Sequence, residues 1–142
     1  MPKDALATAL FFLKFRPRSE FEIEKKLKEK KISEKEITDT IKVLKRNKLL
    51  DDAEFAKMYV RDRNRFKPSG TYLLKLELKR LGLSEVNIEN ALTGQDEEVL
   101  ARQALEAKHR YREADFEKQA QFLQRRGFKT NIIYKVLNKE AE

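Results

Sequence analysis

The chain contains no cysteine and a single histidine, His109. The absence of cysteine excludes disulfides, thiolate zinc sites and cysteine nucleophiles. One histidine with no HExxH-type pairing leaves metal and triad chemistry without the partners that they need. No glycine-rich loop follows a strand-like segment, so a nucleotide-binding signature is also missing. We therefore expect a protein that is not an enzyme and that holds no metal and no cofactor.

Long apolar runs are missing as well. No stretch approaches the roughly 20 apolar residues of a membrane span, and the N-terminal residues lack the pattern of a secretory signal. We expect a cytoplasmic protein without membrane contact. Charged residues make up 39 % of the chain and the mean hydropathy is −0.74, values typical of disordered chains. The apolar residues nevertheless keep a helical spacing throughout, which predicts an ordered protein.

The few glycines and prolines punctuate a helical unit that occurs three times. A shift of 51 positions places the apolar residues of the first repeat on those of the second, and a further shift of 45 reaches the third. The coinciding positions are Ile23 and Leu74; Leu27, Leu78 and Leu123; Ile37, Ile88 and Ile133; and Ile41, Leu92 and Leu137. Such a period is typical of stacked units that are each too small to bury an apolar face alone. We expect an all-α fold of three tandem three-helix repeats, at residues 1–50, 51–94 and 95–142, in an elongated, curved array.

Local signals place the helix starts. Ser19 and Ser33 each open a capping box, with a glutamate three residues later. Asp51-Asp52 is explained by N-capping better than as a catalytic carboxylate pair, because adjacent side chains at a helix start point in different directions. About nine helices are expected, near residues 4–15, from 19, from 33, and at 51–66, 71–81, 84–92, 96–111, 114–126 and 130–138.

Glycines mark several helix ends. Gly82, Gly94 and Gly127 each follow a predicted helix, where a residue with positive φ closes the last turn at least steric cost. Lys31 occupies the equivalent position of the first repeat.

The charge balance is basic. The formal net charge is +8 and the pI is near 9.6, which favours polyanions or acidic protein surfaces as partners. The excess is uneven, since residues 1–50 carry a net charge of +6 and each later repeat carries +1. The dense run of lysines over residues 25–31 is interpreted as a solvated helix face.

One polar element is common to all three repeats and lies at the end of each first helix. Lys14-Phe15-Arg16, Arg65-Phe66-Lys67 and Arg110-Tyr111-Arg112 superpose under the same two shifts. As a binding element, the cations meet phosphates or carboxylates and the aromatic ring offers a stacking face. As a structural element, the ring seals the bundle and the cations complement the negative end of the helix dipole. The sequence leaves both interpretations open.

Further cations extend this element. Arg61 and Arg65 share a helix face at i, i+4, where like charges repel, so a binding partner explains the pair better than local stability does. Arg125-Arg126 is placed to complement a helix C-terminus. The candidate filament-binding or DNA-binding residues are Lys14, Arg16, Arg18, Arg61, Arg65, Lys67, Arg110 and Arg112.

Two motifs carry a resemblance to a known family. They are Arg16-Pro17-Arg18-Ser19-Glu20, followed by Ile23 and Leu27, and Leu49-Leu50-Asp51-Asp52, followed by Phe55-Ala56, Arg61 and Gly70. With them the whole chain resembles the RecX regulatory proteins of bacteria, although Lys31 stands where that family generally has glycine. The resemblance implies a tandem three-helix repeat protein that binds the RecA recombinase filament on DNA and modulates strand exchange and coprotease activity. It supplies no catalytic residues to transfer.

The sequence and the resemblance together predict a monomeric, non-enzymatic regulator in the groove of a RecA–DNA filament. We expect it to inhibit recombinase, ATPase and coprotease activity, and to bind single- or double-stranded DNA weakly and in a salt-sensitive way. The alternative is a stand-alone helical protein that binds DNA largely without sequence specificity. A helix-turn-helix reader fits less well, because no helix carries a cluster of Arg, Asn and Gln suited to base edges.

Overall fold

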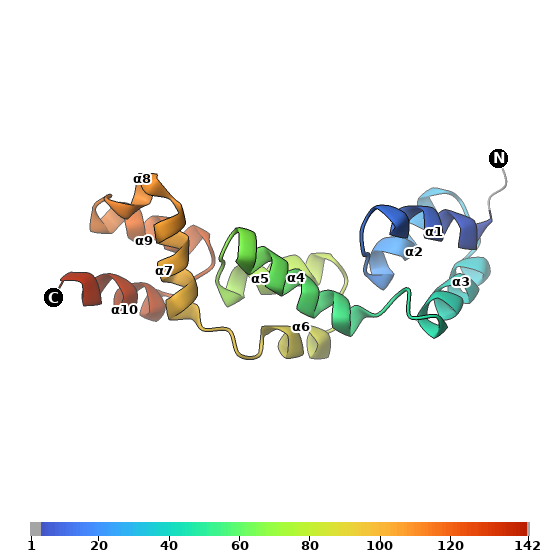
Figure 1. The fold of residues 1–142 in the computed structure, drawn as a ribbon. Helices are drawn as coiled ribbons and strands as arrows, with labels where there is room; N and C mark the ends of the chain where they lie inside the picture. The colour runs from blue at the N-terminus through green and yellow to red at the C-terminus, as the bar shows by residue number, and fades with distance from the viewer. Residues whose placement is uncertain (1–3, 142) are drawn as a thin grey trace.

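The computed structural model describes residues 4–141, and over these residues the chain forms ten helices and no strand. The helices are grouped in a row, with the two ends of the chain at opposite ends of the row (Figure 1). We call the groups unit 1 (α1–α3), unit 2 (α4–α6) and unit 3 (α7–α10). The predicted all-α array of helical repeats is confirmed, while the repeat boundaries after residues 50 and 94 stay predictions.

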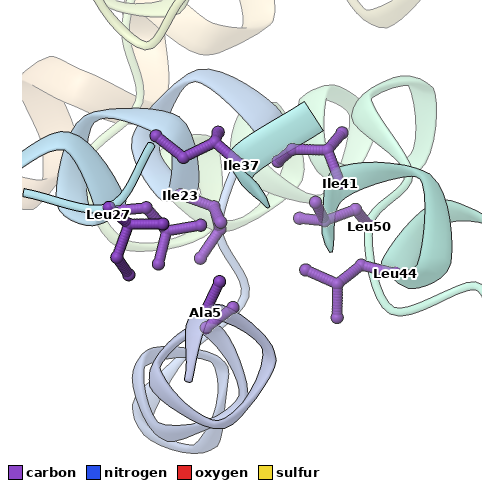
Figure 2. Close-up of a cluster of buried hydrophobic side chains, with 9 residues drawn as sticks. Ala5, Ile23, Leu27, Ile37, Ile41, Leu44 and Leu50 are labelled. Carbon is purple, nitrogen blue, oxygen red and sulfur yellow. The ribbon is translucent and has the colours of Figure 1, made fainter. Parts of the chain in front are cut away.

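Unit 1 contains α1 (Ala5–Phe15), α2 (Glu20–Glu29) and α3 (Glu34–Arg46). Ser19 and Glu22 form the complete predicted capping box. At Ser33 only half of the box forms: the hydroxyl accepts from the Glu36 amide and itself donates to the Glu36 carboxylate. The core residues of this unit lie between the three helices (Figure 2).

Unit 2 contains α4 (Asp52–Phe66), α5 (Thr71–Arg80) and α6 (Glu85–Leu92). Asp51 caps α4 by accepting from the Glu54 amide at 3.2 Å, as the sequence predicts. Leu74 and Leu78 of α5 are fully buried. They pack with Phe55, Ala56 and Val60 of α4 in a cluster of their own.

Unit 3 contains α7 (Glu97–Ala107), α8 (His109–Arg112), α9 (Phe116–Arg125) and α10 (Thr130–Ala141). The single helix predicted over 96–111 is wrong, because Lys108 is extended and separates α7 from α8. Gln119 of α9 donates to the carbonyls of Tyr111 and Arg112, and the Tyr111 ring stacks on Phe122 of α9. These contacts between α8 and α9 hold α8 apart from α7. Local sequence preference does not predict this interruption of the helix.

Each unit buries its own core. The three clusters lie within residues 5–50, 55–88 and 101–137. The fully buried positions Leu27, Leu78 and Leu123 are related by the two shifts that define the repeat. Continuity along the row therefore depends on the contacts at the two junctions between units.

The junction between units 1 and 2 joins the start of α2 to the end of α5. The Ser19 hydroxyl donates to the Leu81 carbonyl at 2.7 Å. The Glu20 amide donates to the Asp52 carboxylate at 2.9 Å. The first turn of α2 thus finds in the next unit an acceptor for the Glu20 amide, which has no partner within its own helix, and another for the Ser19 hydroxyl.

The junction between units 2 and 3 repeats this arrangement at the equivalent positions. The Gly70 amide donates to the Arg126 carbonyl at 2.7 Å. The Thr71 amide donates to the Glu97 carboxylate at 2.9 Å. The repeat therefore includes the contact between neighbouring units as well as the helices.

Glycine is required at these junctions for two reasons. The expected positive φ is confirmed, with values of +80° at Gly82 and +87° at Gly127; Lys31 has φ of 61° at the equivalent position of unit 1. In addition, a Cβ at Gly82 would collide with Phe21, and a Cβ at Gly127 would collide with Leu73. The sequence indicated the first reason, whereas the second arises only when the units meet.

Gly70→Ala tests the second junction. Gly70 has φ of −78° and ψ of 161°, which any residue adopts, but a Cβ there would collide with the backbone of Gly127. We expect a loss of about 1–3 kcal/mol in the free energy of unfolding, the usual cost of overpacking, measured by urea denaturation. Small-angle X-ray scattering should also show a changed shape.

Gly94→Ala is the control, because nothing lies within 4 Å of the added Cβ. The shape of this variant should stay the same as that of wild type. Unchanged stability of Gly70→Ala would contradict the described junction.

Candidate polyanion-binding surface

The three recurring aromatic rings have different environments. Phe15 and Phe66 are 65 % and 79 % exposed, so neither ring seals its bundle. Tyr111 is half-buried and stacks on Phe122 with the ring centroids 4.2 Å apart. The structural interpretation therefore applies to Tyr111, and two of the three rings are open to a partner.

The first group of cations is partly neutralised. Arg16 forms a bidentate pair with Glu22, at 3.2 Å and 2.5 Å. Burial would raise the pKa of Glu22, but the bonds from Arg16 and from the Ser19 amide outweigh it and hold the pKa below its ordinary value. Arg18 is half-buried over the Phe12 ring, and its buried Nε atom has no hydrogen-bond partner. Lys14 is exposed.

The second group surrounds the end of α4. Arg61, Arg65 and Lys67 are exposed, and the Arg65 guanidinium lies 5.5 Å from the centroid of the Phe66 ring. The structure therefore leaves the predicted cations of this helix accessible to solvent and to a partner.

Arg63, on the same helix, is instead held in the structure. It donates to both carboxylate oxygens of Glu77 at 2.8 Å and to the Lys67 carbonyl at 3.0 Å. The Tyr59 hydroxyl donates to the same carboxylate at 2.6 Å. This network ties α4 to α5.

The third group lies on α8. The Arg110 guanidinium is 5.5 Å from the centroid of the Tyr111 ring, and Arg112 bonds Nδ1 of His109 at 2.5 Å. Both arginines are exposed. Arg125 of α9 donates to the Tyr111 hydroxyl at 3.1 Å, so a further cation joins this group from another helix.

A cleft lies at each of the two junctions. The cleft between units 1 and 2 has a volume of about 670 Å³, and its apolar lining includes Phe55, Met58 and Leu81. The cleft between units 2 and 3 has a volume of about 460 Å³. The cations that line it are Arg63, Lys67, Lys108, Arg110, Arg125 and Arg126. The first cleft is therefore mainly apolar and the second mainly cationic.

The structure brings some of the predicted cations together and separates others. Arg16 and Lys67 line the first cleft, and Lys67 and Arg110 line the second. Arg18 and Arg61 share a smaller cavity of about 260 Å³ beside Pro17. The remaining predicted cations, Lys14, Arg65 and Arg112, do not line either cleft.

Sequence reasoning missed several lining residues of the second cleft. Arg63 and Lys108 carry no signal that separates them from other surface cations. Arg126 was assigned to its own helix end, but its guanidinium reaches unit 2 and donates to the Pro68 carbonyl at 2.8 Å. The repeat could have indicated that Arg126 is unusual, because the equivalent position in unit 2 holds the apolar residue Leu81.

Residues 4–141 contain neither a metal-binding cluster nor a membrane-spanning helix. No group of three or more His, Cys, Asp or Glu side chains there is arranged to hold a metal ion. No described helix has the length and apolar character needed to span a membrane.

Glu77→Gln tests the network beside the clefts. The bonds from Arg63 hold the pKa of Glu77 below its ordinary value of 4.5, against the opposing effect of burial. A carboxyl with a lower pKa in the folded state stabilises the fold above its unfolded-state pKa, and this contribution is lost as the pH falls through the folded-state pKa. At neutral pH we expect Glu77→Gln to lower the free energy of unfolding by about 1–3 kcal/mol. In urea denaturation at several pH values, the difference from wild type should shrink below pH 4.5.

Glu54→Gln is the matched control, because Glu54 is exposed and its Oε1 lies 3.9 Å from Lys57 Nζ. It should change stability little, as exposed pairs do. A Glu77→Gln effect that stays constant down to pH 2 would contradict the assigned role of the carboxylate.

Comparison with family models identifies two segments of the chain. Residues 5–44 match the model described as RecX, first three-helix domain, and residues 51–92 match RecX, second three-helix domain. These segments correspond to most of units 1 and 2.

Whole-chain comparisons extend the similarity to unit 3. A regulatory protein RecX of a Geobacillus species is 37 % identical over 94 % of this chain, and the chain spans about half, 52 %, of that relative's length. The RecX protein of Chlorobium phaeobacteroides is 35 % identical, with 96 % of this chain and 93 % of the relative covered. The crystal structure of RecX from Lactobacillus salivarius superposes with a TM-score of 0.82 at 26 % identity, covering 95 % of this chain and 93 % of that one.

Proposed function

Because the chain belongs to the RecX family of regulatory proteins, we propose that it binds RecA filaments on DNA and inhibits their activity. It acts in the cytoplasm as a monomeric binding protein that catalyses no reaction of its own. The observation that carries the proposal is the placement of cations at both junctions of an elongated array. Arg16, Lys67 and Arg110 line successive clefts along the row.

The array suits a partner that is itself a repeating polymer. Each junction offers a modest site, and an array that engages several protomers at once gains affinity through effective concentration. Phe15 and Phe66 add exposed rings beside the cations. Several weak contacts at a matching spacing then give strong binding to a filament and weak binding to a single protomer.

DNA in the filament supplies a second kind of contact. Cations that neutralise phosphates release counterions, so affinity for naked DNA is weak at physiological salt and falls as salt rises. On α4, the residues between the exposed cations are already occupied: Arg63 donates to Glu77, and Asn64 bonds Gln95 and the Ser69 amide. Binding of DNA is therefore proposed to be independent of sequence.

Co-sedimentation with RecA tests the proposal directly. The protein should pellet with RecA filaments on single-stranded DNA, and it should pellet less with DNA alone at physiological salt. DNA-dependent ATP hydrolysis by RecA should fall at or below one protein per RecA protomer, because each bound array spans several protomers. Equal pelleting with and without RecA, together with unchanged ATP hydrolysis, would instead identify a stand-alone DNA-binding protein.

Substitution of the recurring cations tests the multivalent surface. Gln is introduced at Arg65 and Lys67, at Arg110 and Arg112, or at all four positions, with Phe66 and Tyr111 kept. If the cations form one surface, filament affinity should fall modestly for each pair and much more for the combination, while the protein stays folded. Their contribution to helix stability is at most about 1 kcal/mol each.

A control with the same loss of charge separates a local effect from a general one. It carries Gln at four exposed lysines outside both clefts: Lys35, Lys42, Lys75 and Lys79. Filament affinity of this control should exceed that of the four-site variant. Equal affinity of the folded four-site variant and wild type would end the proposal that these cations bind the filament.

A further inference from the structure

The cleft between units 2 and 3 collects positive charge from both sides. Arg63 and Lys67 come from unit 2, and Lys108, Arg110, Arg125 and Arg126 come from unit 3. Glu77 is the one carboxylate among the lining residues of this cleft, and its oxygens already accept from Arg63 and Tyr59. No other carboxylate lines this cleft, although Arg110 and Arg125 also line a neighbouring cavity with Glu113 and Asp115.

Arg126 is the least expected of these cations. It is only 7 % exposed, its Nη1 donates to the Pro68 carbonyl at 2.8 Å, and its guanidinium lies 4.8 Å from the centroid of the Phe122 ring. No carboxylate pairs with it in the described part of the chain. Burial, and then the charge of Arg63, lower the pKa of Arg126. A buried arginine is ordinarily paired with an anion.

The fold does not require a cation at this position. The equivalent residue of unit 2 is Leu81, whose carbonyl accepts a bond from unit 1 just as the Arg126 carbonyl accepts one from unit 2. That contact uses the backbone carbonyl in both places, so a leucine can make it as well as an arginine. The Arg126 guanidinium adds a bond to Pro68 through Nη1, but a neutral donor would serve for that bond, and neither contact explains a buried cation.

We propose that this cleft binds a phosphate group, with Arg126 at its base and Lys67, Arg110 and Arg125 at its rim. Several guanidinium groups converge there, and their planar forks suit the tetrahedral, multiply charged oxygens of phosphate. A carboxylate offers fewer oxygens and less charge to so many donors. The volume of about 460 Å³ accommodates the group together with its attached sugar.

The phosphate site rests on the proposed function for its natural ligand, because a RecA filament on DNA presents phosphodiester groups. The same chemistry is offered by a free phosphate or pyrophosphate ion, so both sources enter the test. In either case the anion touches units 2 and 3 together. Binding should therefore stabilise the folded array, because a ligand that binds only the folded state raises its stability by mass action.

Arg126→Leu is the central variant, because the repeat itself places leucine at the equivalent position. Thermal unfolding of the full chain is measured with sodium pyrophosphate and with sodium chloride at equal ionic strength. Binding of a single-stranded abasic deoxyribose-phosphate oligomer is measured in parallel by fluorescence anisotropy. Wild type should melt at higher temperature in pyrophosphate than in chloride, whereas Arg126→Leu should fold and show little of this increase. Affinity for the phosphate probe should weaken by about tenfold to a hundredfold, the ratio for one lost charge-assisted partner.

Two further variants sharpen the result. Arg46→Leu removes one exposed arginine of α3 in unit 1 and should leave the response to pyrophosphate unchanged. Arg126→Lys keeps the charge without the planar fork and should weaken the response in part, which keeps the test decisive even if Arg126→Leu fails to fold.

The two probes separate the sources of the phosphate. Loss of oligomer binding with no wild-type response to pyrophosphate assigns the site to the nucleic-acid backbone, and loss of both responses assigns it to phosphate in general. Equal responses of wild type, Arg126→Leu and Arg126→Lys to both probes would overturn the site. RecA is absent from these measurements, so failure of filament binding and failure of the phosphate site are recognised separately.

Discussion

The row of units depends on one contact that occurs twice. The first turn of α2 packs on the last turn of α5, and the first turn of α5 packs on the last turn of α9. Helix starts leave amides without partners, and here a carboxylate of the neighbouring unit accepts from the first amide of the helix. A carbonyl of that unit accepts from the Ser19 hydroxyl at the first junction and from the Gly70 amide at the second. Glu20 bonds Asp52, and Thr71 bonds Glu97. The contact is polar and directional, so it fixes the orientation of each unit while every unit buries its own apolar core. Gly82 and Gly127 permit the close approach that it needs.

This seating also creates the clefts. Where α2 meets α5, the end of α1 lies beside the junction. Where α5 meets α9, the end of α4 does so. The cation that follows each of these helices lines the space between the units. Arg16 is placed in this way at the first junction and Lys67 at the second. The network of Arg63, Glu77 and Tyr59 holds the wall that the two clefts share. The proposed binding surface thus arises from the same contact that builds the array.

Equivalent positions then acquire different chemistry without a change of fold. The carbonyls of Leu81 at the first junction and Arg126 at the second accept from equivalent positions, from the Ser19 hydroxyl and the Gly70 amide. The side chains at these positions differ, and Leu81 adds to the apolar lining of the first cleft while Arg126 adds to the cations of the second. One repeat architecture thus carries an apolar cleft at one junction and a cationic cleft at the other.

The sequence by itself determined the helices, their caps, the threefold repeat and the positive φ after α5, α6 and α9, because each rests on local spacing or on the backbone of one residue. The recurring element also predicted Arg16, Lys67 and Arg110 as binding residues, and the structure places all three in the lining of the clefts. Only the tertiary structure decided that α7 and α8 are separate, that Tyr111 is packed while Phe66 is exposed, and that Arg63 is held by Glu77. Arg126 shows the reason most clearly. Its placement depends on a bond to the Pro68 carbonyl, which belongs to unit 2 and is brought to Arg126 only when the units pack together.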